Sequence, residues 1–168
     1  RTVAVMVCAP PDEKDWMSRT LWGSPRLRLV WEGCETVIVE VNSHMPAMVS
    51  EGERHLLFHV SEADAIVETD RMPAENVPVP ATEADRLVAG HIAELEPDGA
   101  CMQFGLGGLA NAVGECLAYA GKKDLGVHTE VLTSCVMELM QKGIVNNSRK
   151  KLLPGRSVGA FLVGDRKH

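Results

Sequence analysis

The sequence predicts an α/β protein built from open, mostly parallel sheets with flanking helices. Valine-rich apolar runs recur between proline, glycine and charged residues, and in the second half of the chain they alternate with amphipathic segments. The runs lack strict alternation, which is typical of strands covered on both faces in parallel sheets. A chain of 168 residues forms one ordinary domain or two small pieces.

The first half predicts four strands, at residues 3–8, 36–41, 56–60 and 65–67. Residues 72–81, MPAENVPVPA, carry three prolines and nothing periodic. We therefore expect an extended linker there, and with it the domain boundary.

The second half opens with a predicted helix whose N-cap is Thr82. Its apolar face is expected from residues at helical spacing: Leu87, Val88, His91, Ile92 and Leu95. The helix should end before 97–99, PDG, and a short strand at 100–104 should follow.

A second predicted helix follows the glycines at 105–108 and ends near Gly121. One face of it collects Leu109, Ala112, Val113, Cys116, Leu117 and Ala120. A strand at 125–129, a helix at 131–142 that stops at Gly143 and a strand at 158–163 complete a strand–helix–strand series. This series predicts a parallel sheet.

Composition excludes several classes of function. The 17 basic and 23 acidic residues give a net charge of −6, and the only basic run, 149–151, is short, so we expect no nucleic-acid partner. No apolar run is long enough to span a membrane and no export signal opens the chain, so we expect no membrane partner and a cytoplasmic location. The five cysteines are widely spaced without a CxxC pair, which favours reduced thiols and no metal site. The chain begins at Arg1 and enters a strand at once, which suggests a piece of a longer protein.

The most informative stretch is 103–111, QFGLGGLAN, between a predicted strand and a predicted helix. Glycines allow a ligand to approach the main chain, and amides at a helix start are aimed at an anion or a developing oxyanion. A purely structural glycine turn is the alternative. The stretch also matches GxGxxA at Gly105, Gly107 and Ala110, with Glu130 at 25 residues beyond Gly105, which is the pattern of a dinucleotide-binding site.

Glu130 ends the predicted strand 125–129, and ligands bind at the carboxyl ends of strands in open α/β sheets. The glycine loop follows the preceding strand, so both should lie at one edge. A carboxylate there can act as a general base, a ribose ligand or a covalent nucleophile, or it can be an exposed acid without a role.

Taken together, 103–113 (QFGLGGLANAV) and 125–131 (LGVHTEV) resemble the acetyl-CoA hydrolase/transferase family, which includes 4-hydroxybutyrate, butyrate and succinate CoA-transferases. Further segments resemble the family in the same order: 9–13, 39–42, 45–46, 58–61, 66–68, 143–147 and 154–155. The resemblance implies a CoA-transferase-like fold of two similar domains. Residues 1–75 would be the C-terminal part of the first domain, and 76–168 the N-terminal part of the second, with the glycine loop and the nucleophile.

The resemblance also implies a mechanism in which Glu130 forms a covalent glutamyl-CoA thioester while CoA moves between an acyl-CoA and a carboxylate. Gly105, Gly107 and Gly108 would surround the oxyanion and CoA, and Gln103, Asn111 and His128 would line the substrate pocket. Coenzyme A is then a substrate, and the acceptor is of the acetate, butyrate, 4-hydroxybutyrate or succinate class.

The chain departs from the family at two places. Ser134-Cys135 stand where an Asp-Gly pair is usual, and Lys14-Asp15 stand where His-Gly is frequent. The alternatives are an acyl-CoA hydrolase of the same family, a non-catalytic dinucleotide-binding module, and an inactive homo-oligomer associated through exposed sheet edges.

Overall fold

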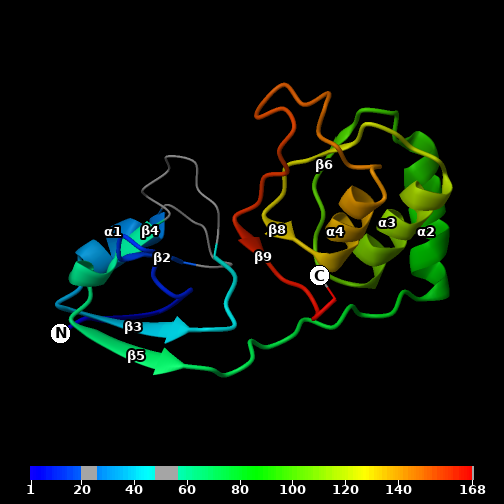
Figure 1. Ribbon diagram of the computed structural model, residues 1–168. Coiled ribbons are helices and arrows are strands. Elements are labelled where there is room, and N and C mark those ends of the chain that lie inside the picture. The colour runs from blue at the N-terminus through cyan, green and yellow to red at the C-terminus, as the bar shows by residue number, and fades with distance from the viewer. Residues whose placement is uncertain (20–25, 48–56, 168) are drawn as a thin grey trace. The chain divides into compact units, whose positions relative to one another are not determined.

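The computed structural model describes residues 1–19, 26–47 and 57–167. The chain folds into two compact units, Arg1–Ala74 (unit 1) and Glu75–His168 (unit 2) (Figure 1). Each unit has its own cluster of buried apolar side chains.

Unit 1 is centred on a parallel sheet with the strand order β1–β3–β5, formed by β1 (Val3–Cys8), β3 (Thr36–Asn42) and β5 (Ala65–Thr69). The expected strands are confirmed here. A two-stranded antiparallel sheet pairs β2 (Trp16–Ser18) with β4 (Leu57–His59). The sequence predictions missed β2 and helix α1 (Arg26–Glu32), and residue 56 of the predicted third strand lies outside the described residues. A 3₁₀ turn, η2 (Val60–Glu62), follows β4.

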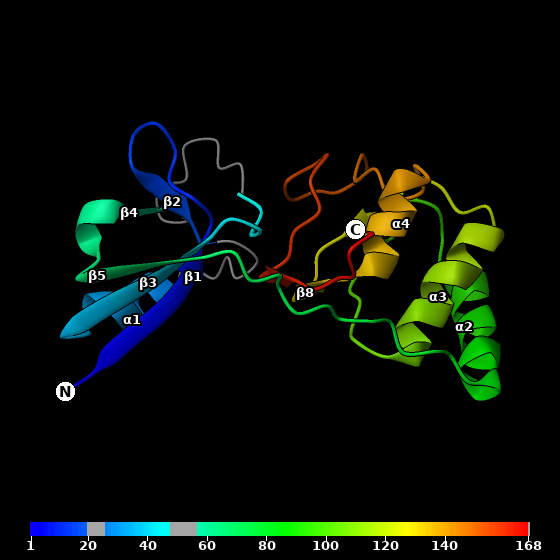
Figure 2. The ribbon, with the colours of Figure 1, turned by 60° about the horizontal axis from the view of Figure 1, so that its bottom comes forward.

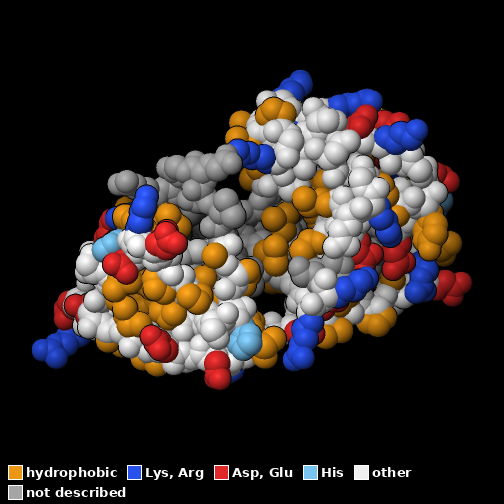
Figure 3. All heavy atoms as spheres, viewed as in Figure 1, with side chains coloured by type: hydrophobic (Ala, Val, Ile, Leu, Met, Phe, Trp, Pro, Cys, Tyr) orange, Lys and Arg blue, Asp and Glu red, His pale blue; other side chains and the backbone are white. Residues whose placement is uncertain are grey.

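Only one face of the parallel sheet in unit 1 is fully buried. Val37, Val39 and Val41 of the central strand pack against Trp31 and Phe58. Large apolar side chains on the two outer strands remain exposed: Val3, Val5, Ile66 and Val67. Figure 3 shows hydrophobic side chains gathered over these strands. The expectation of strands covered on both faces is therefore wrong for β1 and β5, the two edge strands of this sheet.

Unit 2 contains two parallel strand pairs. The first pairs β6 (Cys101–Met102) with β7 (Gly126–Val127), and helix α3 (Gly108–Tyr119) connects them. The second pairs β8 (Val131–Leu132) with β9 (Phe161–Leu162), and helix α4 (Ser134–Gln141) lies between them in sequence. Two isolated parallel β-bridges, Leu125–Val145 and His128–Val158, extend β7 at its two ends. The predicted strand–helix–strand series with parallel pairing is confirmed, although each strand is shorter than expected.

Helix α2 (Glu83–Leu95) starts where the sequence predicted but buries a different face. Thr82 Oγ1 accepts a hydrogen bond from Asp85 N (3.2 Å), and Asp85 Oδ2 accepts one from Thr82 N (2.8 Å), which forms a capping box. The buried side chains are Ala89 and Ala93, not the larger ones. Four of the five predicted face residues are exposed: Leu87, Val88, His91 and Leu95. Small alanines let α2 pack closely against α3, and this spacing decides which side of α2 faces the core (Figure 2).

Helix α3 buries Ala112, Val113 and Leu117 as predicted and reaches its end before Gly121, whose φ of +66° favours glycine. Leu109 and Ala120 of the predicted face lie exposed. Figures 1 and 2 show α3 between α2 and α4.

The predicted helix at 131–142 is shorter in the structure. Its first residues form β8 instead, because Val131 and Leu132 pair with Phe161 and Leu162. Helix α4 therefore begins at Ser134.

Candidate active site

The glycine loop and Glu130 emerge from neighbouring parallel strands. In the register of β6 and β7, Met102 pairs with Val127, and His128 N then donates to Met102 O (3.0 Å). The glycine loop follows β6 and Glu130 follows β7, so both lie beyond the carboxyl ends of these strands. This edge is the place where open α/β sheets bind ligands.

Thr129 fastens the two segments to each other. The Thr129 side chain is buried; its Oγ1 donates to Phe104 O (2.8 Å) and accepts from Phe104 N (3.2 Å). Phe104 is also buried and directly precedes Gly105. Thr129, which precedes Glu130, thus makes two hydrogen bonds to Phe104, which precedes Gly105. These bonds fix the position of the glycine loop relative to Glu130.

The backbone of Glu130 is anchored while its side chain is exposed. Glu130 O accepts from Ala160 N (2.8 Å) and Phe161 N (3.2 Å). Among the described residues, none donates a hydrogen bond to the Glu130 carboxylate. The geometry leaves this carboxylate accessible to a reactant from solvent.

The glycine loop meets the conditions for a main-chain anion site. Gly107 is the N-cap of α3, has φ +116°, and has no side-chain cap. A Cβ on Gly108 would lie 2.9 Å from Pro80 O, so the close approach of residue 80 requires a glycine there. The amides of the first helical turn have no acceptor within the helix and remain available to a ligand.

The three predicted pocket residues lie in different surroundings. Gln103 and His128 are exposed at the ends of β6 and β7, and Gln103 Nε2 makes only a long hydrogen bond to Phe104 O (3.4 Å). Asn111 lies one turn into α3, and its Nδ2 donates to Val79 O (3.1 Å). The structure therefore places Gln103 and His128 beside the edge, whereas Asn111 ties α3 to the extended segment before α2.

Two residues that the sequence analysis did not single out brace the strand that precedes Glu130. Asn147 is buried with φ +59°; its Oδ1 accepts from Val127 N (2.9 Å) and its Nδ2 donates to Ser157 Oγ (3.0 Å). Lys150 is also buried, and its Nζ donates to Val127 O (2.8 Å) and Arg156 O (2.6 Å). In the sequence, Lys150 belongs to a short basic run that reads as solvated, and no local pattern distinguishes it.

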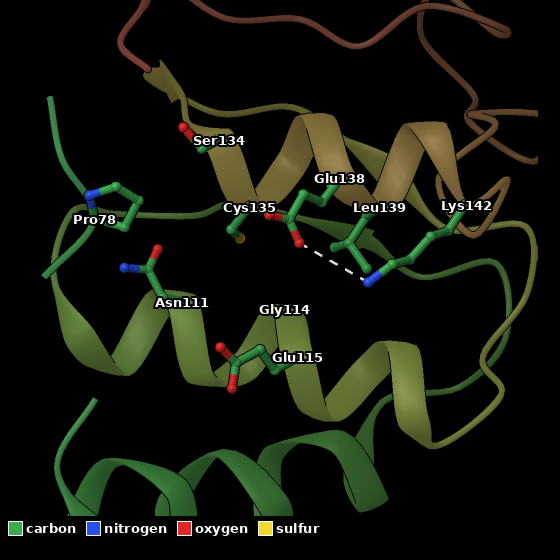
Figure 4. A pocket seen from close by; sticks show the side chains of 9 residues that line it. All are labelled: Pro78, Asn111, Gly114, Glu115, Ser134, Cys135, Glu138, Leu139 and Lys142. Carbon is green, nitrogen blue, oxygen red and sulfur yellow. Dashed lines mark ion pairs between the residues drawn. The ribbon is translucent and has the colours of Figure 1, made fainter. Parts of the chain in front are cut away.

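A hollow of about 80 Å³ lies between α3 and α4, away from the residues that were predicted to react (Figure 4). Figure 4 shows Asn111, Gly114 and Glu115 on α3 facing Ser134, Cys135 and Glu138 on α4. Burial raises the pKa of the Cys135 thiol to about 11; a hydrogen bond with the Thr133 side chain acts in the opposite direction, and the carboxylates of Glu138 and Glu115 add to the increase. A Cβ on Gly114 would lie 2.7 Å from Cys135 Sγ. The thiol is therefore a protonated packing group.

Two further kinds of feature are absent from the part of the chain that the structure describes. No helix there is long and apolar enough to cross a bilayer. No group of three or more His, Cys, Asp or Glu side chains is arranged there to hold a metal ion.

The chain is similar in sequence to characterised CoA-transferases. It is 38% identical to succinyl-CoA:cyclohexane-1-carboxylate CoA transferase of Geobacter metallireducens over 96% of the chain and 36% of that protein. It is 36% identical to butyryl-CoA:acetate CoA-transferase of Anaerostipes caccae over 98% of the chain and 37% of that protein. An acetyl-CoA hydrolase of Yarrowia lipolytica matches over 56% of the chain at 32% identity. No family model matches the sequence.

Solved structures agree with the sequence comparison. The crystal structure of 4-hydroxybutyrate CoA-transferase from Porphyromonas gingivalis superposes with a TM-score of 0.87 at 32% identity, over 99% of this chain and 41% of that one. The crystal structure of RipA from Yersinia pestis superposes with a TM-score of 0.85 at 36% identity, over 99% of this chain and 37% of that one. The chain thus spans little more than a third of the length of the two curated relatives described above. By sequence and by fold, the chain corresponds to a segment of the CoA-transferases related to acetyl-CoA hydrolase.

Proposed function

We propose that this chain carries the nucleophile and the oxyanion loop of a CoA-transferase that moves CoA between an acyl-CoA and a small carboxylate. The supporting observation is the Thr129–Phe104 pair, which holds Glu130 and the glycine loop in a fixed relation at one sheet edge. Covalent catalysis by a carboxylate requires this arrangement, because the nucleophile and the oxyanion donors must reach the same carbonyl group.

The proposed reaction begins when the Glu130 carboxylate attacks the thioester carbonyl carbon of the acyl-CoA. The carbon–sulfur bond breaks, CoA leaves as a thiolate, and an acyl-glutamyl anhydride remains. The thiolate then attacks the glutamyl carbonyl, which releases the acyl group as a carboxylate and forms the glutamyl-CoA thioester. The acceptor carboxylate reverses these steps and regenerates Glu130, so no proton or electron is gained or lost overall.

The amides of the loop Gly105, Gly107 and Gly108 are the proposed oxyanion donors. Each tetrahedral intermediate carries a negative oxygen, and removal of one such donor typically lowers the rate by ~10²- to 10³-fold. In this proposal Gln103 and His128, at the ends of β6 and β7, contact the acyl or carboxylate group. The substrates are acyl-CoA and carboxylates of the acetate, butyrate, 4-hydroxybutyrate or succinate class, and a cytoplasmic location belongs to the same proposal.

The test is intact-mass spectrometry of the chain after incubation with acetyl-, butyryl- and succinyl-CoA followed by borohydride. Reduction of a glutamyl-CoA thioester to the alcohol lowers the mass of the protein by about 14 Da, and we expect this loss at Glu130 after peptide mapping. Glu130→Gln should abolish it, whereas Glu94→Gln, at another exposed glutamate, should not. No mass loss with any thioester, or a loss that persists in Glu130→Gln, would contradict the proposal for this chain.

A hydrolase is the second candidate, because the Yarrowia lipolytica relative is an acetyl-CoA hydrolase. In that case water replaces the acceptor carboxylate in the last half-reaction. Release of free CoA thiol without an added carboxylate would indicate the hydrolase, and its dependence on acetate would indicate the transferase. Binding of NAD that requires Glu130, without any thioester adduct, would instead indicate the dinucleotide-binding alternative.

A further inference from the structure

Lys150 carries a buried charge that the proposed reaction does not use. The residue is 7% exposed, and its Nζ donates hydrogen bonds to Val127 O (2.8 Å) and Arg156 O (2.6 Å). No carboxylate of the described residues forms an ion pair with this ammonium. Removing an ammonium from water is costly, and an apolar side chain of similar shape avoids that cost. A lysine at this position therefore points to a role in holding these two carbonyl groups together.

The alkyl stem and the backbone of Lys150 direct the ammonium to one place on β7. A Cβ on Gly126 would lie 2.5 Å from Lys150 Cγ and 2.9 Å from Lys150 Cδ, so the glycine leaves room for the stem. Lys150 N donates to Asn147 O (3.3 Å), and Asn147 Oδ1 in turn accepts from Val127 N (2.9 Å). The side chain is thus held from both of its ends.

The segment 156–161 pairs with the residues around Glu130 in one parallel register. The bridge between His128 and Val158 precedes Glu130, and the pairing of β8 with β9 follows it in the same register. Between them, Glu130 O accepts hydrogen bonds from two backbone amides of this segment. The position of the Glu130 peptide therefore depends on where the segment 156–161 lies.

Lys150 fastens the start of this segment to β7. Arg156 O accepts from Lys150 Nζ, and Val127 O accepts from both Lys150 Nζ and Val158 N (3.1 Å). One ammonium therefore joins the two backbones where the loop 148–155 returns to β7. A side chain without N–H donors would leave Arg156 O without this hydrogen bond, and the start of the segment would lose its tether.

We propose that Lys150 is a positioning residue of the transfer reaction: it ties Arg156 to Val127 and so places the Glu130 peptide for attack. The inference rests on the proposed function, because it concerns the reaction of Glu130. Thr129 holds the neighbouring peptide from the β6 side, and Lys150 acts from the opposite side through the segment 156–161. Lys150 touches no substrate in this role, so its replacement changes the rate of the reaction and not the affinity for acyl-CoA.

The test compares Lys150→Met, which keeps the stem but removes the donors, with Lys150→Arg, which keeps the charge and several N–H donors. Lys151→Met, at the neighbouring exposed lysine, is the matched control. Single-turnover reactions with butyryl-CoA, followed by borohydride and intact-mass spectrometry, give the rate constant of adduct formation and the half-saturating concentration. All reactions are run well below the Tm of every variant, which far-UV circular dichroism supplies.

We expect Lys150→Met to lower the rate constant at saturating butyryl-CoA by about 10- to 100-fold, because small displacements of a reacting group have effects of this size. The half-saturating concentration should change by less than about threefold. Lys150→Arg should retain most of the rate, and Lys151→Met all of it. An unchanged rate constant in Lys150→Met, a change confined to the half-saturating concentration, or an equal loss in Lys150→Arg would each overturn the inference.

Hydrogen exchange of the same variants gives a readout that needs no turnover. Lys150→Met should accelerate exchange of the Val158, Ala160 and Phe161 amides, which donate to Val127 O and Glu130 O, and leave the amides of α2 unchanged. Equal acceleration throughout unit 2, or none, would show that Lys150 does not tether this segment. Absence of an adduct in the wild-type chain would refute the proposed function, and the positioning role with it. A wild-type adduct whose rate is unaffected in Lys150→Met would refute the positioning role alone.

Discussion

Replacement of Thr129 by valine tests whether its hydroxyl holds the glycine loop to the strand that carries Glu130. The substitution preserves the shape of a buried side chain but removes both hydrogen bonds to Phe104 (2.8 and 3.2 Å). Each bond contributes about 0.5–1.5 kcal/mol net, and a buried N–H left without a partner costs about 1–3 kcal/mol more. Because Phe104 O keeps its long hydrogen bond from Gln103, we expect unit 2 to lose about 2–3 kcal/mol of its free energy of unfolding.

The expected change in melting temperature follows from the size of unit 2, Glu75–His168. At about 2.1 cal/mol/K of unfolding entropy per residue, the loss corresponds to a decrease in Tm of roughly 10–15 °C. All three tryptophans of the sequence lie in unit 1, so tryptophan fluorescence does not report on unit 2. Far-UV circular dichroism and the hydrogen-exchange rate of the Phe104 amide are the appropriate measurements.

Thr133→Val is the matched control. Thr133 is as buried as Thr129, but its hydroxyl bonds to no backbone group in the described part of the chain and interacts only with the Cys135 thiol. Its replacement should change stability by less than about 0.5 kcal/mol, because only a weak interaction with a thiol is lost and no backbone group loses its partner. Equal destabilisation by the two substitutions, or an unchanged exchange rate of the Phe104 amide in Thr129→Val, would refute the reasoning.

Three further predictions concern unit 2. Gly114→Ala should lower the free energy of unfolding by about 1–3 kcal/mol in urea denaturation, because the new Cβ would lie 2.7 Å from Cys135 Sγ. Adding Cys135→Ala should restore most of this loss. A double variant as unstable as Gly114→Ala would contradict this packing. Hydrogen bonds from the Thr82 backbone and side chain lower the pKa of Asp85 below its ordinary value of 3.8. The Asp85 carboxylate therefore stabilises the folded state at pH values above the unfolded pKa. This stabilisation is lost as the pH falls through the lower pKa of the folded state. Asp85→Asn should flatten the dependence of Tm on pH in this acid range, and an unchanged slope would count against the capping box. Because burial raises the pKa of Cys135 to about 11, alkylation near neutral pH should modify the exposed Cys101 first, and peptide mapping that finds Cys135 modified first would contradict its burial.

Several features of the site follow from the sequence because they depend on local chemistry and on a general topological rule. Valine-rich runs predict β1 and β3, and Thr82 as N-cap predicts the start of α2. Glu130 and the glycine loop could be placed at one edge because successive parallel strands end on the same side of a sheet. None of these inferences needs knowledge of which distant residues meet.

The tertiary structure alone decided the features that depend on distant partners. Val131 and Leu132 form β8 because β9 pairs with them, although their neighbours favour a helix. The alanine face of α2 is buried because close approach to α3 outweighs the larger side chains on the other faces. Asn147 and Lys150 each make one hydrogen bond to the backbone of Val127, in the strand before Glu130, and such bonds leave no periodic pattern in a sequence. Sequence periodicity records which face of an element can be buried, whereas the partner that buries it is set by contacts between residues far apart in the chain.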